Sequence, residues 1–163
     1  MKNINFKVNR VGENGNLLKD MLPMSLPYSV MIEPTNACNF ACIFCPTGSV
    51  DLLKKVGRPK GTMKIDLYSK IIDQLFNLSK KYNTKVKGLY LHKDGEPLVN
   101  KDLNKMIIYA KSKNIFETIE VTTNASLLSE SRSIELINSG LDLIRISIYH
   151  TTDDGYKQIT DKQ

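Results

Sequence analysis

The chain has 163 residues, of which 41% are hydrophobic and 25% are charged, and its formal net charge is +6. This length fits one domain with a buried core, and because no apolar run approaches the roughly 20 residues that cross a bilayer, we expect no membrane partner. The positive charge comes mainly from scattered lysines without interleaved aromatic residues, so we do not expect a nucleic acid partner.

The first 27 residues are predicted to be an N-terminal extension, followed by a core domain over residues 28–163. Residues 1–20 mix charged and amide side chains throughout. They lack the apolar stretch that marks a secretory signal, which predicts a cytoplasmic protein. In a reducing compartment, clustered cysteines are more often metal ligands or catalytic thiols than disulfides.

The first predicted strand covers residues 28–33, "YSVMIE", and a loop with three cysteines follows it. A basic segment marked by glycine and proline, "KKVGRPKGTM", then leads to a helix whose start Asp66 is expected to cap. Apolar residues of this helix recur at spacings of three and four, which predicts one buried face. The residues of that face are Leu67, Ile71, Ile72, Leu75 and Phe76.

The second and third units repeat the order of strand, loop and helix. The strand over residues 88–92 leads through the turn "KDGEP" to a helix after Asn100. The strand over residues 118–123 leads through "NASLL" to a helix that begins near Ser129 and stops at Gly140, a good C-terminal cap. The apolar face of the second unit's helix consists of Leu103, Met106, Ile107 and Ala110.

A fourth predicted strand covers residues 141–149, and the residues after it hold at most the start of a helix. The alternation of strands and helices predicts an α/β fold with a parallel sheet. In such folds, ligands lie beyond the carboxyl ends of the strands. The loops after the four strands are therefore expected to meet at one site.

All three cysteines, Cys38, Cys42 and Cys45, lie within the segment "CNFACIFCP". An odd number of cysteines argues against a closed disulfide framework, and loop thiolates at these spacings can converge on zinc or on an iron–sulfur cluster. A structural zinc site would need a fourth ligand, which would have to be His92 or His150. Three cysteines on a four-iron cluster leave one iron open to bind a small molecule.

The spacing C-x3-C-x2-C, placed directly after the first strand of a βα series, resembles the cluster motif of the radical S-adenosylmethionine (SAM) enzymes. Phe44 matches the aromatic position often found before the third cysteine, and the likeness covers residues 29–149. The resemblance implies a partial, TIM-like (β/α) barrel of the radical SAM type, with about four of six βα units present. It also implies a [4Fe–4S] cluster on the three cysteines, and SAM that is cleaved to a 5'-deoxyadenosyl radical.

The segment "DGEP" resembles the family's Gly-Gly-Glu-Pro segment, which binds the amino group of SAM. Gly95 and Glu96 match that segment, whereas Asp94 replaces its first glycine. An ammonium group needs a carboxylate and a close backbone approach, which glycine permits. His92, just before this segment, is more often a hydrogen-bonded structural residue in such a position than a substrate contact.

The segment "TTNAS" resembles the family's Thr-Thr-Asn-Gly segment, with Ala125 in place of the glycine, so the turn is expected to differ. Ser147 matches the fourth-strand position that binds the ribose of SAM. The resemblance thus implies cofactor contacts by Phe44, Gly95, Glu96, Thr122, Asn124 and Ser147.

The segment "GRPKGTM" resembles a stretch found in the subgroup with a C-terminal auxiliary-cluster extension, called SPASM. The resemblance implies a small-molecule or peptide substrate and an electron donor such as flavodoxin or ferredoxin. Because the family's core has six βα units, we predict that this chain is a fragment or a truncated product.

Two other classes of function stay open at this point. The chain could be a zinc-binding structural or interaction module, with the three cysteines and one histidine as ligands. It could also be a non-catalytic iron–sulfur remnant that acts through a partner. A colourless protein with one zinc would favour the module, and a brown protein that does not cleave SAM would favour the remnant.

Overall fold

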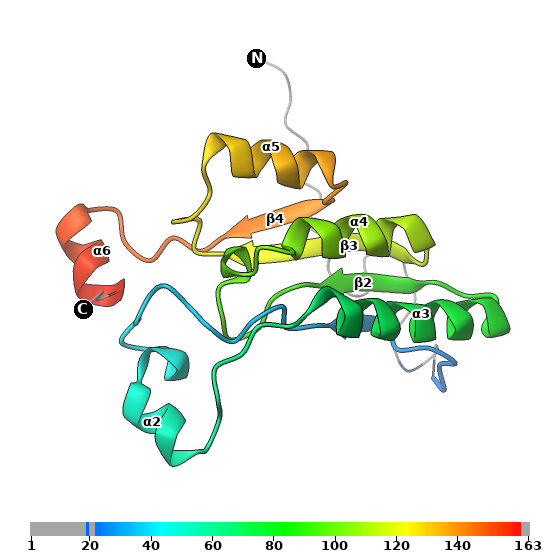
Figure 1. Cartoon of the computed structure of the whole chain (residues 1–163), viewed down its shortest axis with the longest axis horizontal. Coiled ribbons are helices and arrows are strands. Elements are labelled where there is room, and N and C mark those ends of the chain that lie inside the picture. The colour runs from blue at the N-terminus through cyan, green and yellow to red at the C-terminus, as the bar shows by residue number, and fades with distance from the viewer. Residues whose placement is uncertain (1–18, 20–21, 161–163) are drawn as a thin grey trace.

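Four parallel strands form one sheet in the order β1-β2-β3-β4, so strands that are consecutive in the sequence are neighbours in space (Figure 1). This computed structural model describes residue 19 and residues 22–160, so the predicted extension over residues 1–27 lies mostly outside the described residues. The predicted α/β fold with a parallel sheet is confirmed. The strands are β1 (Ser29–Met31), β2 (Val86–Tyr90), β3 (Phe116–Thr123) and β4 (Leu143–Ile146).

Helices connect the successive strands, and α3, α4 and α5 lie on the same face of the sheet (Figure 1). Within the described residues, no helix combines the length and the apolar character that crossing a bilayer requires. Two short 3-10 helices, η1 (Pro46–Gly48) and η2 (Pro97–Val99), lie in the loops after β1 and β2. The α-helices are α2 (Val50–Lys55), α3 (Ile65–Tyr82), α4 (Leu103–Lys113), α5 (Glu130–Asn138) and α6 (Asp153–Thr160).

The hydrophobic core lies between the sheet and these covering helices. Leu89 from β2, Leu91 directly after that strand, and Ile119 and Val121 from β3 are fully buried in it. The described end of the predicted extension also contributes, because Leu26 is buried in the same core. The predicted apolar face of α4 is confirmed, since all its members are buried: Leu103, Met106, Ile107 and Ala110.

Helix α3 corrects two sequence predictions. The predicted burial of Leu67 is wrong, because its side chain is 53% exposed, and Tyr68 is fully buried instead, together with Ile72. The predicted capping by Asp66 is also wrong. Lys64 occupies the N-cap position and makes no side-chain cap, while Asp66 lies inside the first turn, where a negative charge favours the helix dipole.

The predicted ends of α5 agree with the structure. The Ser129 side chain accepts a hydrogen bond from the Arg132 N–H, and Gly140 follows the last turn with a φ of +82°, a conformation that glycine adopts without strain. The predicted strands at residues 28–33 and 141–149 are shorter in the structure. Single backbone hydrogen bonds to the neighbouring strand continue past their ends, such as those from the Ile32 N–H to Tyr90 and from the Ser147 N–H to Thr123, but the regular ladder stops earlier.

Candidate functional site

A cavity of about 150 Å³ lies at the carboxyl ends of the strands. Its lining includes all three cysteines and every residue predicted to contact the cofactor: Cys38, Cys42, Cys45, Phe44, Gly95, Glu96, Thr122, Asn124 and Ser147. The four loops therefore converge on one site, as the topology predicted. His92 and Tyr149 also line it.

The three thiols are free, and they differ in exposure. Cys42 is buried, whereas Cys38 and Cys45 are half-buried. Burial raises the pKa of the Cys38 and Cys42 thiols, and the neighbouring cysteines raise the pKa of Cys42 further. Because metal ligation requires thiolates, binding of a cluster to this loop must release protons.

The "DGEP" loop is pressed against the start of the cysteine loop. A Cβ atom placed on Gly95 would lie 2.1 Å from the carbonyl oxygen of Thr35 and 2.8 Å from that of Ala37. The next amide, the N–H of Glu96, donates a hydrogen bond of 2.9 Å to the same Ala37 oxygen. Gly95 is thus needed for a close approach of two protein loops, whatever else it contacts.

The carboxylate of Glu96 ties the second-strand loop to the end of β3. Its Oε1 accepts from the Thr123 hydroxyl at 2.6 Å and from the Leu98 N–H at 3.0 Å, and its Oε2 accepts from the Asn124 N–H at 2.8 Å. The residue is only 3% exposed. A carboxylate has about four acceptor positions, so three internal donors leave room for one further donor.

Asn124 joins the loop after β3 to the cysteine loop. Its side-chain amide donates to Asn39 Oδ1 at 3.0 Å, and its own Oδ1 accepts from the Ser126 N–H and hydroxyl. Ala125, between them, has a φ of +59°. The residue at the position of the family's glycine therefore has the left-handed conformation that glycine favours, although alanine stands there, and a different turn from the family's stays a prediction.

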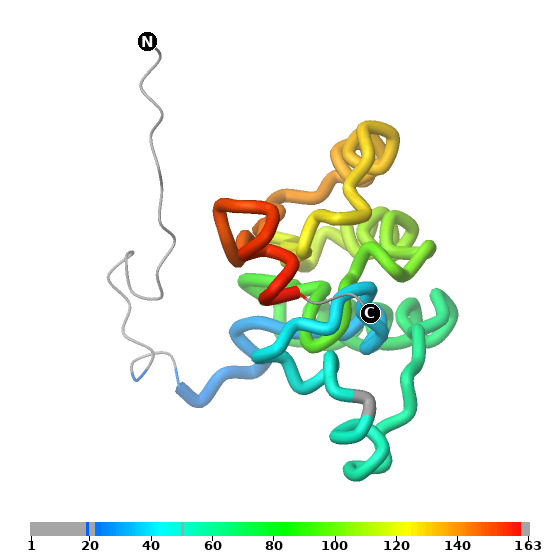
Figure 2. Tube along the Cα trace, turned by 90° about the vertical axis from the view of Figure 1, so that its left-hand side faces the viewer, coloured from blue at the N-terminus to red at the C-terminus, as the bar shows by residue number. Residues whose placement is uncertain are grey.

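Aromatic rings connect the cysteine loop to α6. Phe44 meets Tyr149 edge to face with ring centroids 5.1 Å apart, and Phe40 lies 6.2 Å from Tyr156. The N–H groups of residues 41 and 43 donate to the carbonyls of residues 160 and 159 at the end of this helix. Figure 2 shows the red α6 beside the cyan loop.

A network of charges that the sequence did not reveal begins in the lining of the cavity, because Asp94 belongs to both. The Arg58 guanidinium donates to Glu33 Oε2 at 2.8 Å and also pairs with the Asp94 carboxylate. The Asp94 N–H donates to Glu33 Oε1, and its carbonyl accepts from Thr47, two residues after the last cysteine. Asp94, which departs from the family's glycine, therefore joins three loops.

This network predicts a specific loss of stability in acid. The hydrogen bond from Arg58, more than any other contact, holds the pKa of Asp94 below its ordinary value of 3.8. A lowered carboxyl pKa stabilises the fold above about pH 4, and this stabilisation disappears as the pH falls through the folded-state pKa. We expect the melting temperature of Arg58→Gln to fall less steeply than that of the wild type as the pH is lowered below about 4.

The matched control for this experiment is Lys105→Gln, which removes a different surface pair, that with Asp102. Its melting temperature should fall in acid as steeply as that of the wild type. An equally steep fall for Arg58→Gln would contradict the assignment.

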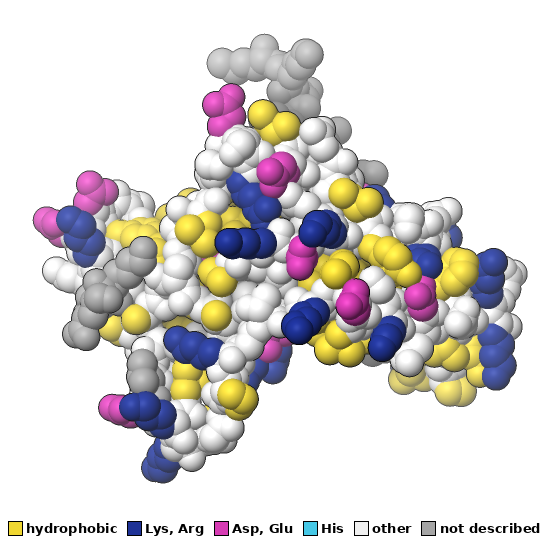
Figure 3. Space-filling model, in the orientation of Figure 1, with side chains coloured by type: hydrophobic (Ala, Val, Ile, Leu, Met, Phe, Trp, Pro, Cys, Tyr) yellow, Lys and Arg dark blue, Asp and Glu magenta, His cyan; other side chains and the backbone are white. Residues whose placement is uncertain are grey.

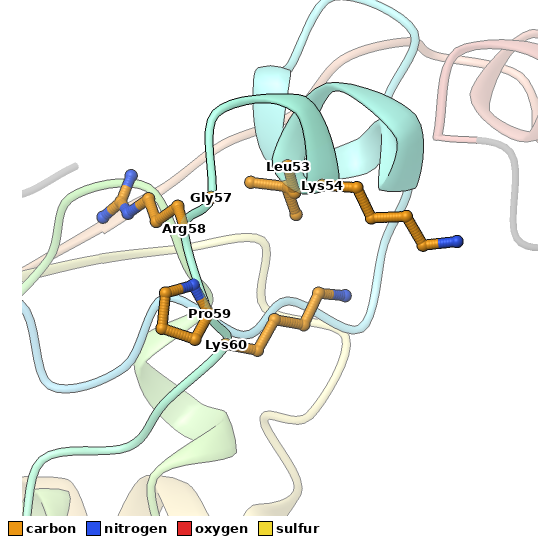
Figure 4. A pocket seen from close by; sticks show the side chains of 6 residues that line it. All are labelled: Leu53, Lys54, Gly57, Arg58, Pro59 and Lys60. Atoms are coloured by element: carbon orange, nitrogen blue, oxygen red, sulfur yellow. The ribbon is translucent and has the colours of Figure 1, made fainter.

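A larger hollow, of about 530 Å³, lies between α2 and the segment after it, and it holds none of the predicted site residues. Figure 4 shows its lining, in which the side chains of Lys54 and Lys60 extend away from Arg58. Over the face seen in Figure 3, basic side chains are interspersed with acidic and hydrophobic ones. We assign the site to the smaller cavity, because the cysteines line that one.

The donor set fits a cluster better than a single metal ion. Within residues 19 and 22–160, no group of three or more His, Cys, Asp and Glu side chains is arranged to hold one metal ion. Of the two histidines that could supply a fourth zinc ligand, His92 lines the cavity and His150 does not. Three soft sulfur ligands around one cavity suit an iron–sulfur cluster that keeps an open position.

Fold and site together define a partial parallel α/β barrel with a cysteine-lined cavity at the carboxyl ends of its strands. The family profile described as "Radical SAM superfamily" matches residues 32–163. The chain therefore belongs to the radical SAM superfamily, whose members are enzymes that use a [4Fe–4S] cluster and S-adenosylmethionine.

Individual relatives are similar to this chain over most of its length. A GTP 3',8-cyclase of Clostridium botulinum (strain Hall) is 29% identical over 131 residues, which are 79% of this chain and 37% of that protein. A probable GTP 3',8-cyclase of Methanococcus maripaludis is 30% identical over 135 residues, or 81% of this chain and 40% of that protein. The chain thus spans about two fifths of the length of these relatives.

Among solved structures, BtrN in complex with AdoMet and 2-DOIA has the same fold, with a TM-score of 0.63 and 21% sequence identity. The match covers 85% of this chain and 52% of BtrN. This likeness confirms the partial, TIM-like barrel of the radical SAM type.

Proposed function

We propose that this chain carries the cluster-binding and SAM-binding part of a radical SAM enzyme, with Cys38, Cys42 and Cys45 as ligands of a [4Fe–4S] cluster. The observation that carries the proposal is the cavity that these cysteines share with all six predicted cofactor contacts. When bound, the cluster and SAM together supply a 5'-deoxyadenosyl radical, which abstracts a hydrogen atom from the substrate. Radical chemistry of this kind belongs to the cofactors, and the protein binds and orients them.

The proposed roles of the other residues follow from their contacts. Glu96 keeps one acceptor position for the ammonium group of SAM, because three internal donors occupy the others. Phe44 and Tyr149, whose rings contact each other edge to face, line the same cavity as Cys42 and offer aromatic surface to the cofactor. Thr122 in β3, Asn124 after that strand and Ser147 after β4 contribute polar side chains to the lining of the cavity.

We further propose that the substrate is a small molecule or a peptide. We also propose a flavodoxin or ferredoxin as the electron donor, because reductive cleavage of SAM needs a single electron and these proteins transfer single electrons. The proposed location is the cytoplasm. All three cysteines are free, which suits a reducing compartment, and SAM and its reductants would be available there.

The direct test is anaerobic reconstitution of the full chain with iron and sulfide, followed by addition of SAM and dithionite. We expect about four irons per chain, and formation of 5'-deoxyadenosine that Cys42→Ala abolishes. The matched control is Ile43→Ala in the same loop, whose side chain is 73% exposed and should not matter. A reconstituted cluster without any 5'-deoxyadenosine would favour the non-catalytic remnant, and one bound zinc without a cluster would favour the zinc module.

A further inference from the structure

The inner face of the sheet, which we define as the face not covered by α3, α4 and α5, carries polar side chains, and one of them, that of Thr122, also lines the cysteine-lined cavity. Strand side chains alternate between faces, and paired residues of parallel strands share a face. Tyr90 pairs with Glu120, and Thr122 pairs with Arg145. Because Leu89, its partner Ile119 and Val121 point into the core, these four residues point to the inner face.

Glu120 and Arg145 form an asymmetric ion pair on this face. The guanidinium donates to both carboxylate oxygens of Glu120, through Nε to Oε1 and through Nη2 to Oε2. The Glu120 side chain is 9% exposed, whereas that of Arg145 is 60% exposed. The buried carboxylate has both oxygens occupied, so it orients the guanidinium and offers little to a ligand.

His92 follows Tyr90 by two residues, so it is on the same face of the sheet, and it lines the cavity. Its Nδ1 accepts the N–H of Thr122 at 3.2 Å, so in the neutral ring the proton is on Nε2. The neutral form is favoured, because burial lowers the pKa of this imidazole. Among the described residues, nothing accepts the Nε2 proton or the Nη1 protons of Arg145.

The two nitrogen groups on the inner face that find no acceptor among the described residues, Nε2 of His92 and Nη1 of Arg145, are therefore free to donate to a ligand, and Glu120 holds the guanidinium in a fixed plane. Such a guanidinium matches the oxygens of carboxylate and phosphate groups. We propose that Arg145 and His92 form a binding site for a carboxylate or phosphate group of the substrate. That the bound group belongs to a substrate rests on the proposed function, but the binding itself can be measured without a cluster or SAM.

The experiment uses the full chain without cluster, labelled with ¹⁵N-histidine, and titrates it with inorganic phosphate and with acetate at constant pH and ionic strength. The chain has only two histidines, so His150 is an internal reference. We expect one or both anions to shift the ring signals of His92 saturably and those of His150 far less. The anion that binds more tightly distinguishes a phosphate from a carboxylate ligand.

Arg145→Gln should weaken this binding by roughly tenfold or more, because a hydrogen bond to a charged group is lost with the charge itself. Since that change leaves Glu120 buried without a partner, the double variant Glu120→Gln, Arg145→Gln provides a second test without an unpaired charge. Lys60→Gln, which removes a cation from the outer surface, is the matched control and should bind as the wild type does.

A second readout is the rise in melting temperature that the bound anion causes. His92→Asn can still accept the Thr122 N–H but lacks a donor at the Nε2 position, so we expect a smaller rise, whereas His92→Gln can place an N–H there and should restore part of it. The proposal is overturned if His92 does not respond to either anion, if both histidines respond alike, or if the double variant binds unchanged. None of these outcomes would alter the result of the 5'-deoxyadenosine assay.

Discussion

Gly95→Ala is expected to unfold the site and to lower the free energy of unfolding by about 3 kcal/mol or more, the range of severe overpacking. The added methyl group would lie 2.1 Å from the Thr35 carbonyl oxygen, and that atom belongs to the backbone rather than to a flexible side chain. Relief requires the two loops to move apart. That movement would break the hydrogen bond from the Glu96 N–H to the Ala37 oxygen.

The measurement is urea denaturation of the chain without cluster, so that the loss of stability is separate from any loss of cofactor. Gly61→Ala is a matched control, because a Cβ at Gly61 meets nothing within 4 Å and its φ lies outside the left-handed region. We expect that control to change the free energy of unfolding by less than about 1 kcal/mol. Equal stability of the two variants would show that the loops are not packed as described.

The case of Gly95 shows what a local pattern can and cannot predict. The motif indicated a close approach at Gly95, and the structure shows that residues 35–37 supply the nearest protein atoms, whereas the approach of the cofactor to this glycine stays a prediction. These residues lie nearly sixty positions earlier in the sequence. A contact between residues so far apart in the sequence depends on the fold, and the spacing of residues within a short motif cannot predict it.

The fold was largely predictable, because strand, loop and helix alternate with clear periodicity and parallel βα units allow few topologies. The short helix α2 and the network of Glu33, Arg58 and Asp94 were not predictable in this way. Their charged side chains fit an exposed loop equally well when they are read one by one. Similarly, Leu67 and Tyr68 both satisfy a helical spacing, and only the position of the sheet decides which of them is buried.

Glu96→Ala is the second substitution for which we expect a large effect, a loss of about 3–5 kcal/mol in the free energy of unfolding. The change leaves three donors without their acceptor: the Thr123 hydroxyl and the N–H groups of Leu98 and Asn124. Unpaired buried donors cost about 1–3 kcal/mol each, although such losses are not additive. Only 3% of Glu96 is exposed to solvent, so water can hardly reach these donors to replace the lost carboxylate.

Glu96→Gln separates the structural role of this carboxylate from its proposed role toward SAM. The glutamine oxygen can still accept from Thr123 and Leu98, but its amide group would then face the Asn124 N–H, donor against donor. We expect an intermediate loss of about 1–3 kcal/mol, visible in urea denaturation without cofactor. Glu130→Gln, at an exposed position in the first turn of α5, should stay within about 0.5 kcal/mol of the wild type.

The order of the two Glu96 variants and the wild type in stability shows whether this carboxylate assembles the cavity or only binds the cofactor. If stability falls from wild type to Glu96→Gln to Glu96→Ala before any SAM is present, the carboxylate first assembles the cavity, and SAM binds to a group already fixed by three donors. A preorganised carboxylate of this kind loses little freedom when it binds an ammonium group. If both variants were as stable as the wild type and only SAM binding weakened, the three internal hydrogen bonds would contribute nothing to the fold, and Glu96 would act on the cofactor alone.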